Sequence, residues 1–315
     1  MLQNSLNYNG YYYVDEDDIN YLLWRIDSYD VEQRLECVSR RFLGVPYKEL
    51  DCMMYVEEVM SLTSGAQAFD EYERALSGIR YVDGVERFGM RRHFVSIDWL
   101  PENEDLGYIE DISKKIASEE LEYTSLEIDR IKWVIEKDNL DFVEKVTAEW
   151  DLVTINKDLV EYAVIGYVPL ASFYTKCGDE IVPNEKLIKS LPNISIVLFI
   201  RPQQNAEKYG AIVAHMGFLM FSKGEDDSRG EPILRHASSR FGMIIDEPFL
   251  PYIDSQSRYR AGVTILKVLE HERSPLVGAL HYARPDMILR RPYADDEAVR
   301  ARAFAAGASS VIRKG

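Results

Sequence analysis

The segment GVPYKELDCMMYVEEVM, residues 44–60, decides how the fold of this chain can be interpreted. A turn with Gly44 and Pro46 leads to Asp51, a residue type that is preferred as a helix N-cap. Apolar side chains then recur at helical spacing: Cys52, Tyr55, Val56, Val59 and Met60. The pattern predicts a helix that begins at Cys52, buries one face and carries a thiol in its first turn.

The thiol of Cys52 has two interpretations. Aligned peptide dipoles and free N–H groups at the start of a helix favour the thiolate, which is the nucleophilic form of cysteine. This makes Cys52 a candidate nucleophile. A cysteine on an apolar helix face is also commonly a small packed hydrophobe, and this segment alone leaves both interpretations open.

Composition limits the classes of protein to which the chain can belong. The chain has 315 residues, 46% of them hydrophobic, and a net charge of -16. Such an acid excess promotes solubility and argues against a general nucleic-acid binder, which needs a concentrated basic face. Three cysteines, Cys37, Cys52 and Cys177, include no CxxC pair, so we expect free thiols with neither a disulfide scaffold nor a zinc site.

The apolar pattern also bears on where the protein works. No run of 18 apolar residues is present, so no membrane span is expected. Residues 1–10 lack the basic and apolar regions of a signal peptide. We therefore expect the chain, as written, to stay out of the Sec pathway and to be cytoplasmic as synthesised.

The order of the predicted elements indicates an α+β fold. Four amphipathic stretches predict helices before residue 78, and apolar runs predict strands over residues 194–200, 211–221, 232–238, 242–245 and 262–269. We expect one catalytic domain over residues 1–290, followed by a tail or surface helix over 291–315. Its parts are a helical part (15–78), a mixed insertion (79–190) and an antiparallel sheet (191–290).

The insertion has the least regular pattern. We expect a strand and turn over residues 79–85, an extended segment over 93–101, a short helix over 109–117, a strand over 121–134, and helices over 135–150 and 157–164. Cys177 falls in a predicted loop. The insertion contains no Gly-, Ser- or Pro-rich linker, so it is not predicted to be a separate domain.

Two histidines are candidate partners of the thiol. His215 lies in a predicted central strand, and His236 lies in the next strand, after a polar loop over residues 222–230. In a simple hairpin the two histidines lie directly opposite each other, and Phe221 then lies opposite Gly230. Gly217, on the same face as His215, leaves space beside its ring.

Such a pair suits cysteine chemistry. One imidazole can take the thiol proton while the other holds it in the required tautomer and orientation. Each histidine alone also fits a hydrogen-bonded core residue, so this chemistry depends on the three side chains meeting.

These motifs resemble those of the NlpC-type cell-wall cysteine peptidases and amidases, which have a papain-like fold. The resemblance rests on residues 44–47, on Asp51-Cys52 opening a helix, and on two strand segments, 215–218 and 236–239. More narrowly, residues 41–47, 56–57 and 96–99 are similar to the N-acetylmuramoyl-L-alanine amidase-like branch. The similarity is collinear from about residue 31 to about residue 270.

The resemblance implies roles for individual residues. Cys52 would be the nucleophile, His215 the general base and acid, and His236 the orienting third member. Tyr47 would contact the substrate or the oxyanion, and Asp51 belongs to the same substrate-binding group. Two further residues, Asp98 and Trp99, would line the cleft, with a structural Asp-Trp corner as the alternative. No metal or organic cofactor is required.

The implied activity is hydrolysis of peptidoglycan at the amide between N-acetylmuramic acid and L-alanine, through a thioester intermediate. Two alternatives remain: a papain-like peptidase or acyltransferase on another substrate, and a catalytically inactive binding protein. The expected partner is peptidoglycan or a muropeptide fragment. Delivery to the periplasm or to another cell by a dedicated secretion system would reconcile a wall substrate with the absent signal, and an immunity or chaperone protein would then accompany it.

Three departures from the branch concern specificity. Only residues 48–50 separate Tyr47 from Asp51, where the branch has a longer segment. Met53 and Met54 replace two threonines after the cysteine, and residues 193–195 replace a Gly-Asp-Ile motif. The three catalytic residue types are retained, so we expect the wall around the thiol to differ from that of relatives.

Overall fold

The N-terminal part of the chain forms a layer of helices. The computed structural model describes residues 16–86, 90–130, 133, 160–224 and 228–270. Its first four helices are α1 (Glu16–Ile26), α2 (Val31–Arg41), α3 (Cys52–Thr63) and α4 (Phe69–Arg80). All four were predicted from the apolar spacing. The start of α2 is fixed by a capping box, in which Asp30 and Gln33 each bond the other's backbone N–H.

The C-terminal part forms the sheet. Its strands are β6 (Ile194–Ile200), β7 (Val213–Lys223), β8 (Arg229–Ser238), β9 (Met243–Pro248) and β10 (Gly262–Val268). Three further strands extend it: β1 (Ile109–Asp111), β2 (Glu122–Asp129) and β3 (Val160–Pro169). Among the described residues the order is β2-β3-β10-β6-β7-β8-β9, with β1 on β10, and every neighbouring pair is antiparallel. The predicted α+β class is therefore confirmed, with helices first and the antiparallel sheet later.

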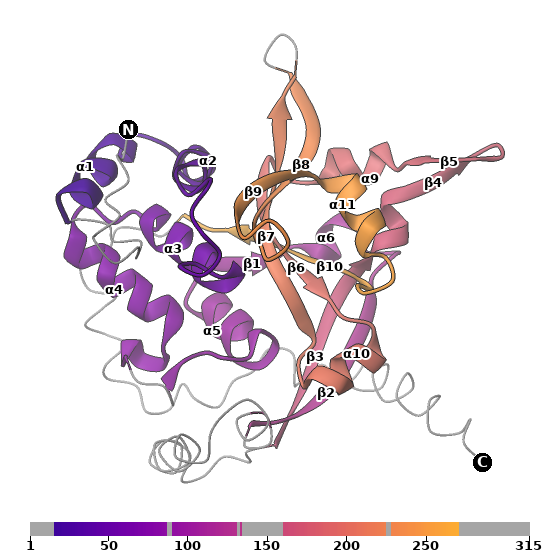
Figure 1. Ribbon diagram of the computed structural model, residues 1–315, viewed down its shortest axis with the longest axis horizontal. Coiled ribbons are helices and arrows are strands. Elements are labelled where there is room, and N and C mark those ends of the chain that lie inside the picture. Colours follow the sequence, from indigo (N-terminus) through magenta and orange to yellow (C-terminus); the bar gives the residue numbers. More distant parts are fainter. Residues whose placement is uncertain (1–15, 87–89, 131–132, 134–159, 225–227, 271–315) are drawn as a thin grey trace.

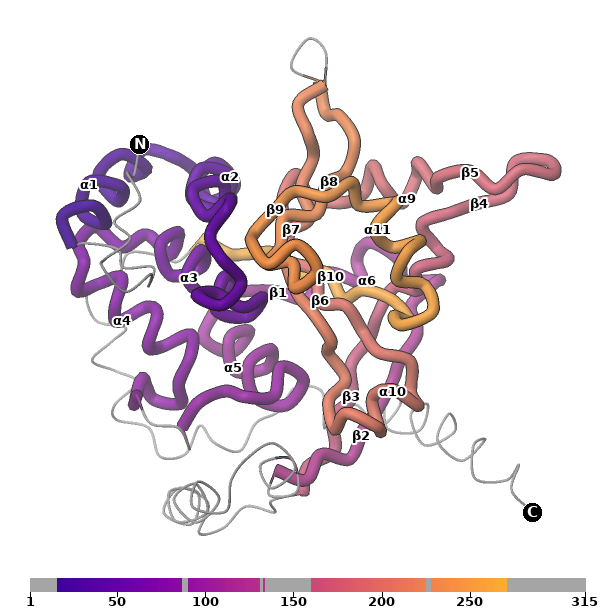
Figure 2. The backbone as a smooth tube through the Cα atoms, in the orientation of Figure 1, coloured from indigo at the N-terminus to yellow at the C-terminus, as the bar shows by residue number. Residues whose placement is uncertain are grey.

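The sheet lies between two layers of helices (Figure 1). One face packs on α2 and α3, and α4 and α1 lie on the far side of α3; the other face is covered by α6 (Ser113–Ile116), α9 (Glu185–Ser190) and α11 (Phe249–Gln256). Every residue of β6 is buried, which explains why its sequence is apolar at every position except Ser195. The tube in Figure 2 follows the chain from the helical layer into the sheet.

The region over residues 79–190 differs most from expectation. Strands β2 and β3 pair with each other, and β3 pairs with β10, so this region extends the main sheet. The predicted helix over 157–164 is wrong from Val160 on, where β3 begins. β-branched and aromatic side chains in β3 favour a strand once the strand can pair with β2. The helix predicted over 135–150 and the tail over 291–315 lie outside the described residues.

Three other local predictions in this region were wrong. The segment predicted as extended over 93–101 forms a π-helical turn (Val95–Trp99) that continues into α5 (Leu100–Asp105). Its Pro101 lies in the first turn of α5, where proline is tolerated because the N–H it lacks has no helical partner. Residues 79–85 finish α4 and form a short 3-10 turn (Val82–Gly84). The helix predicted over 109–117 is divided into β1 and α6.

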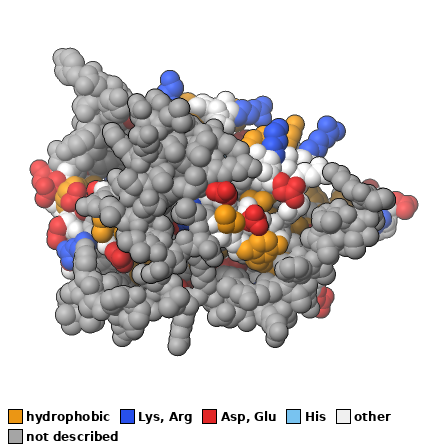
Figure 3. Space-filling view, turned by 90° about the horizontal axis from the view of Figure 1, so that it is seen from below, with side chains coloured by type: hydrophobic (Ala, Val, Ile, Leu, Met, Phe, Trp, Pro, Cys, Tyr) orange, Lys and Arg blue, Asp and Glu red, His pale blue; other side chains and the backbone are white. Residues whose placement is uncertain are grey.

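The remaining described elements lie at the margins of the sheet. They are a 3-10 turn (Leu170–Phe173), the hairpin of β4 (Tyr174–Cys177) and β5 (Glu180–Pro183), and α10 (Gln203–Tyr209). Cys177 ends β4 in this hairpin, with an exposed side chain. No described helix has both the length and the apolar character needed to span a membrane. On the face in Figure 3, acidic, basic and apolar side chains of the described residues are intermixed.

Candidate active site

Helix α3 is fixed at its start and along its buried face. The Asp51 side chain accepts hydrogen bonds from the backbone N–H groups of Met53 and Met54, at 2.9 and 2.8 Å. These bonds satisfy two of the N–H groups that a helix start leaves free. Further along, Tyr55 is fully buried and packs edge-on against Phe218 of β7. The position of Cys52 is therefore determined by a capped helix that is packed on the sheet.

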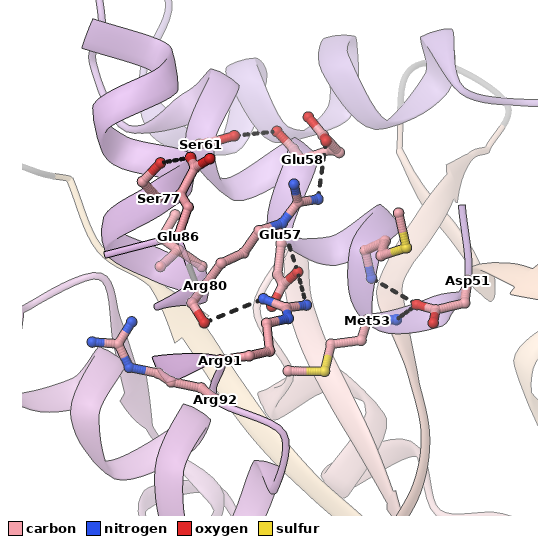
Figure 4. A network of polar contacts seen from close by, with 12 residues as sticks. Asp51, Met53, Glu57, Glu58, Ser61, Ser77, Arg80, Glu86, Arg91 and Arg92 are labelled. Atoms are coloured by element: carbon pink, nitrogen blue, oxygen red, sulfur yellow. Dashed lines mark hydrogen bonds and ion pairs between the residues drawn. The ribbon is translucent and has the colours of Figure 1, made fainter. Parts of the chain in front are cut away.

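A buried ion cluster holds α3 against its neighbours (Figure 4). Glu57 of α3 has no exposed surface and accepts from Arg80 at 3.0 Å and from Arg91 at 2.7 Å. Arg80 also pairs with Glu58 at 3.0 Å. Removing one member of such a buried cluster would leave a charge without its partner, at a cost of about 3–5 kcal/mol. The cluster thus ties α3 to α4 and to the segment after it.

The thiol of Cys52 reaches the backbone of β7 at Met216. Cys52 is partly exposed, and its sulfur lies within hydrogen-bonding reach of the backbone N–H of Met216. Met216 follows His215 directly, and the paired part of β7 and β8 begins two residues further, at Phe218. The structure therefore brings the start of α3 to the start of β7.

The protonation state of Cys52 differs from expectation. Burial, followed by the nearby Asp51 carboxylate, raises the pKa of Cys52 to about 11, although backbone N–H groups oppose the shift. The expected helix-start stabilisation of a thiolate is thus outweighed by desolvation and by a negative neighbour. Near neutral pH the resting group is a thiol, which needs a base to become a nucleophile.

This pKa leads to a prediction about alkylation. With a pKa of about 11, the alkylation rate of Cys52 by iodoacetamide should rise about tenfold per pH unit between about pH 7 and pH 10, because only the thiolate reacts. Quenched samples mapped by peptide mass spectrometry measure the rate, with exposed Cys177 as an internal reference. A Cys52 rate that stays constant between about pH 5 and pH 8 would instead indicate a preformed thiolate–imidazolium pair.

The two histidines form a hydrogen-bonded pair. His215 Nε2 lies 2.7 Å from His236 Nδ1, and the rings are 4.9 Å apart between centroids. Both rings lie on the sheet face covered by α11, where His215 stacks on Phe199 and His236 contacts Tyr252. His215 is partly exposed, whereas His236 is buried. The predicted side-by-side placement of the histidines is thus present in the structure.

The predicted register of the hairpin was wrong by two residues. Phe221 lies opposite Pro232, not Gly230, and the register shifts between Phe221 and Lys223, which lies opposite Arg229. Side chains alternate with a period of two, so a slip of two residues keeps both histidines on one face. They become diagonal neighbours, whose rings are long enough to meet.

Gly217 lies where β7 and β8 approach each other closely. Its neighbour across the hairpin is His236, and a Cβ at residue 217 would lie 2.8 Å from both the Arg235 carbonyl oxygen and His236 Cβ. Glycine is therefore required for the close approach of β8 to β7.

This close approach predicts a stability loss. Gly217→Ala should lower the free energy of unfolding by about 1–3 kcal/mol, because backbone must move to admit the methyl group. Gly78→Ala is the matched control, since its added Cβ meets only the Tyr108 hydroxyl at 3.5 Å, and alanine in helix α4 should be neutral or stabilising by up to about 1 kcal/mol. Denaturant titration measures both. Equal stability of Gly217→Ala and the unchanged protein would contradict the close approach.

Glu247 extends the histidine pair by one member. Its Oε2 lies 2.8 Å from His236 Nε2. A carboxylate only accepts, so His236 carries its proton on Nε2 and accepts at Nδ1. His215 then donates from Nε2, which leaves its Nδ1 without a proton. In this arrangement His215 Nδ1 is the ring nitrogen that can accept a proton.

The electrostatics of the histidines agree with this assignment. Burial, followed by the neighbouring His236, lowers the pKa of His215 well below its usual value. Burial also lowers the pKa of His236, against an opposing effect of Glu247. Both imidazoles are therefore neutral near pH 7, which is the state required of a base and of its orienting partner.

Other predicted residues lie at different distances from the thiol. Tyr47 is partly exposed and interacts electrostatically with Cys52, and burial is the main cause that raises its pKa. Asp98 is 5% exposed and its carboxylate is bound by Arg130. Trp99 has no exposed surface. Both residues are buried in the core, which favours the structural Asp-Trp corner over a place in the cleft wall.

Glu247 and Tyr252 were missed by the sequence analysis. Tyr252 of α11 packs on Phe199 and His236, and burial raises its pKa to about 12. A signal for Glu247 existed: pairing β9 with β8 as a hairpin places it diagonal to His236 on the same face. Within the described ranges, no group of three or more His, Cys, Asp or Glu side chains could hold a metal ion.

Comparisons with known proteins agree on one family and one fold. The model of the AmiA-like family, described as N-acetylmuramoyl-L-alanine amidase-like, matches residues 31–263. No curated protein matches the chain. A solved structure from Legionella pneumophila is similar over 81% of this chain and 94% of its own, with a TM-score of 0.67 and 23% identity.

A second solved structure carries a function in its name. An N-acetylmuramoyl-L-alanine amidase from Bacteroides uniformis is similar over 76% of this chain and 99% of its own, with a TM-score of 0.53 and 18% identity. At such identities the structural likeness establishes a shared fold, whereas the family match covers the helix α3 and both histidine strands.

Proposed function

Because the chain belongs to the N-acetylmuramoyl-L-alanine amidase-like family, we propose that it is a cysteine amidase that hydrolyses peptidoglycan between N-acetylmuramic acid and L-alanine. The observation that carries this proposal is the meeting of two elements. The start of α3 brings Cys52 to the backbone of Met216. His215, the residue before Met216, is hydrogen-bonded to His236, which is in turn hydrogen-bonded to Glu247. We also propose that the fold is the papain-like fold of the NlpC-type enzymes.

The reaction begins with a neutral thiol and a neutral imidazole. His215 Nδ1 takes the proton from Cys52 Sγ as the sulfur attacks the amide carbonyl carbon. Since desolvation disfavours a free thiolate at this position, proton transfer and attack occur together. The His236 and Glu247 side chains stabilise the imidazolium that forms on His215, through the two hydrogen bonds that fix its orientation.

Collapse of the tetrahedral intermediate gives a thioester. His215 returns the proton to the leaving nitrogen, which departs as the free amine of the peptide. Water then attacks the thioester carbonyl while His215 takes its proton, and the lactyl carboxylate and the Cys52 thiol are released. The oxyanion of both steps is stabilised by the backbone N–H of Cys52 at the start of α3, with the Tyr47 hydroxyl as a second donor.

Glu247 is a positioning residue in this mechanism, and its variants give a prediction. Glu247→Ala should lower kcat by about tenfold or more with little change in KM, because the tautomer of His236 is no longer fixed. Glu247→Gln should retain most of the activity, since its amide oxygen can accept from His236 Nε2. Steady-state kinetics and melting temperatures are measured for both. A purely structural role would instead lower stability and activity together in the two variants.

The altered segments around the thiol favour a second candidate function. Only residues 48–50 lie between Tyr47 and Asp51, and Met53 and Met54 follow the cysteine. These residues differ from the pattern of the branch, which favours a papain-like peptidase or acyltransferase on another substrate as the alternative. A catalytically inactive binding protein is the third possibility.

Purified muropeptides separate the three functions. The full chain and its Cys52→Ala variant are each incubated with defined muropeptides, and the products are identified by mass spectrometry. Release of the intact stem peptide by the unchanged protein alone supports the amidase. Cleavage within the stem supports the peptidase, and tight binding without any product supports the binding protein.

A further inference from the structure

Two arginines, Arg201 and Arg260, lie at the same end of the sheet as His215. Arg201 follows β6 and Arg260 precedes β10. These two strand ends are joined by a hydrogen bond from the Ala261 N–H to the Ile200 carbonyl, at 2.8 Å. Both guanidinium groups interact electrostatically with Cys52, and Arg260 also interacts with His215. The pair therefore belongs to the surroundings of the thiol.

The other well-buried arginines that flank the core have carboxylate partners. Each forms an ion pair of 3.0 Å or less: Arg34 with Glu270, Arg80 with Glu57 and Glu58, Arg91 with Glu57, Arg92 with Glu102, and Arg235 with Asp246. Arg130 pairs with Asp98 and Glu161. Pairing with a carboxylate is thus how this chain stabilises a guanidinium that is withdrawn from water.

Arg201 and Arg260 do not follow this rule. Within the described ranges no carboxylate pairs with either of them. Arg201 donates to the carbonyl oxygens of Ala211 and Val213, and its guanidinium lies over the Tyr209 ring, 5.2 Å from the centroid. Arg260 donates from Nη1 to the Tyr259 carbonyl, at 2.9 Å, and its Nε is buried without a partner. Burial lowers the pKa of both groups.

A partly buried arginine without a carboxylate partner lowers the stability of the fold. The chain has an excess of acidic residues, yet none of the described ones pairs with these two arginines. The sequence contains 53 Asp and Glu residues against 37 Lys and Arg. A buried charge with an unbonded N–H destabilises the protein until an acceptor arrives. An incoming carboxylate would satisfy Arg260 Nε and pair with both cations, and arginine is the side chain best suited to that geometry.

We propose that Arg201 and Arg260 form an anion-binding subsite beside Cys52, which takes a carboxylate on the peptide part of the substrate. The proposal rests on the amidase function above. The carboxylate must lie close to the scissile amide, because one extended residue spans only about 3.3–3.6 Å. In a stem peptide whose second residue is a glutamate linked through its side chain, the free α-carboxylate meets this requirement. The subsite would select substrates with that group ionised.

Binding to the Cys52→Ala variant tests the subsite without turnover. Two muropeptides are compared by isothermal titration calorimetry: one with a free glutamate α-carboxylate, and one with that group converted to a carboxamide. We expect the free acid to bind at least about tenfold more tightly, since it makes charge-assisted hydrogen bonds. Adding Arg260→Gln to the Cys52→Ala background should remove this preference, while Arg201→Lys, which keeps the charge, should retain part of it.

Arg74→Gln is the matched control, because Arg74 is exposed and pairs with Asp70 on α4; it should leave the preference unchanged. Equal binding of the two muropeptides, a preference that survives in Arg260→Gln, or no binding of either would overturn the subsite. Turnover by the protein with Cys52 intact is measured on the same two muropeptides. Hydrolysis without the expected binding preference would contradict the subsite alone, whereas failure to hydrolyse either would contradict the amidase function.

Discussion

Replacing Cys52 by alanine is expected to reduce hydrolysis of muropeptides by at least about 10⁴-fold, because the proposed acyl-enzyme forms on its thiol. In the described part of the chain the other two cysteines lie elsewhere: Cys37 is in α2, and Cys177 is in the β4–β5 hairpin. Initial rates from chromatographic separation of the products measure the effect.

The fold should survive this substitution. Cys52 is partly exposed, and the anchors of α3 are other residues: the Asp51 cap, Tyr55 on Phe218, and the Glu57 cluster. We expect the free energy of unfolding to change by no more than about 1 kcal/mol. Cys177→Ala is the control for loss of a thiol as such and should keep full activity. Hydrolysis that persists in Cys52→Ala would refute the cysteine mechanism.

Replacing His215 by alanine should also cause a large loss of hydrolysis rate. The rate should fall by about 10³-fold or more, because the thiol at this position has a pKa of about 11 and depends on a base for ionisation. Burial keeps His215 neutral near pH 7, so in the unchanged protein the base is ready. The variant should regain part of its rate as the pH rises towards the pKa of the thiol. A pH profile of kcat/KM for both proteins measures this.

A double variant tests whether His215 acts together with the Cys52 thiol. If Cys52 and His215 act as one unit, Cys52→Ala combined with His215→Ala should be no slower than Cys52→Ala alone. His93 offers a control, since it lies next to Trp133 and not in the histidine pair, and His93→Ala should retain activity. Additive losses in the double variant would indicate that His215 acts independently of the thiol.

Local pattern was sufficient to predict much of the fold. The helix that begins at Cys52 and the buried strand β6 both follow from apolar spacing, because each buries a continuous face. The segments that were missed depend on distant partners. β3 becomes a strand by pairing with β2 and β10, and the turn at Val95–Trp99 is stabilised by Arg130, which binds Asp98. No local pattern contains those contacts.

The sequence predicted which residues make up the candidate site better than it predicted how they are arranged. His215 and His236 remain neighbours because the register slipped by an even number of residues, which conserves the face. The register shift near Phe221 leaves no clear mark in the sequence. Glu247 required a second register, that of β9 on β8. The raised pKa of Cys52 required knowledge of its burial, which spacing along the chain does not provide.

Hydrolysis in H₂¹⁸O identifies both the bond that is broken and the group that breaks it. A defined muropeptide is incubated with the protein in labelled water, and the products are weighed by mass spectrometry. We expect a muramoyl sugar whose new lactyl carboxylate carries one ¹⁸O, together with an unlabelled stem peptide that begins with a free alanine amine. Neither product should form with Cys52→Ala. Label in a carboxylate within the stem peptide, or labelled products from the Cys52→Ala variant, would contradict it.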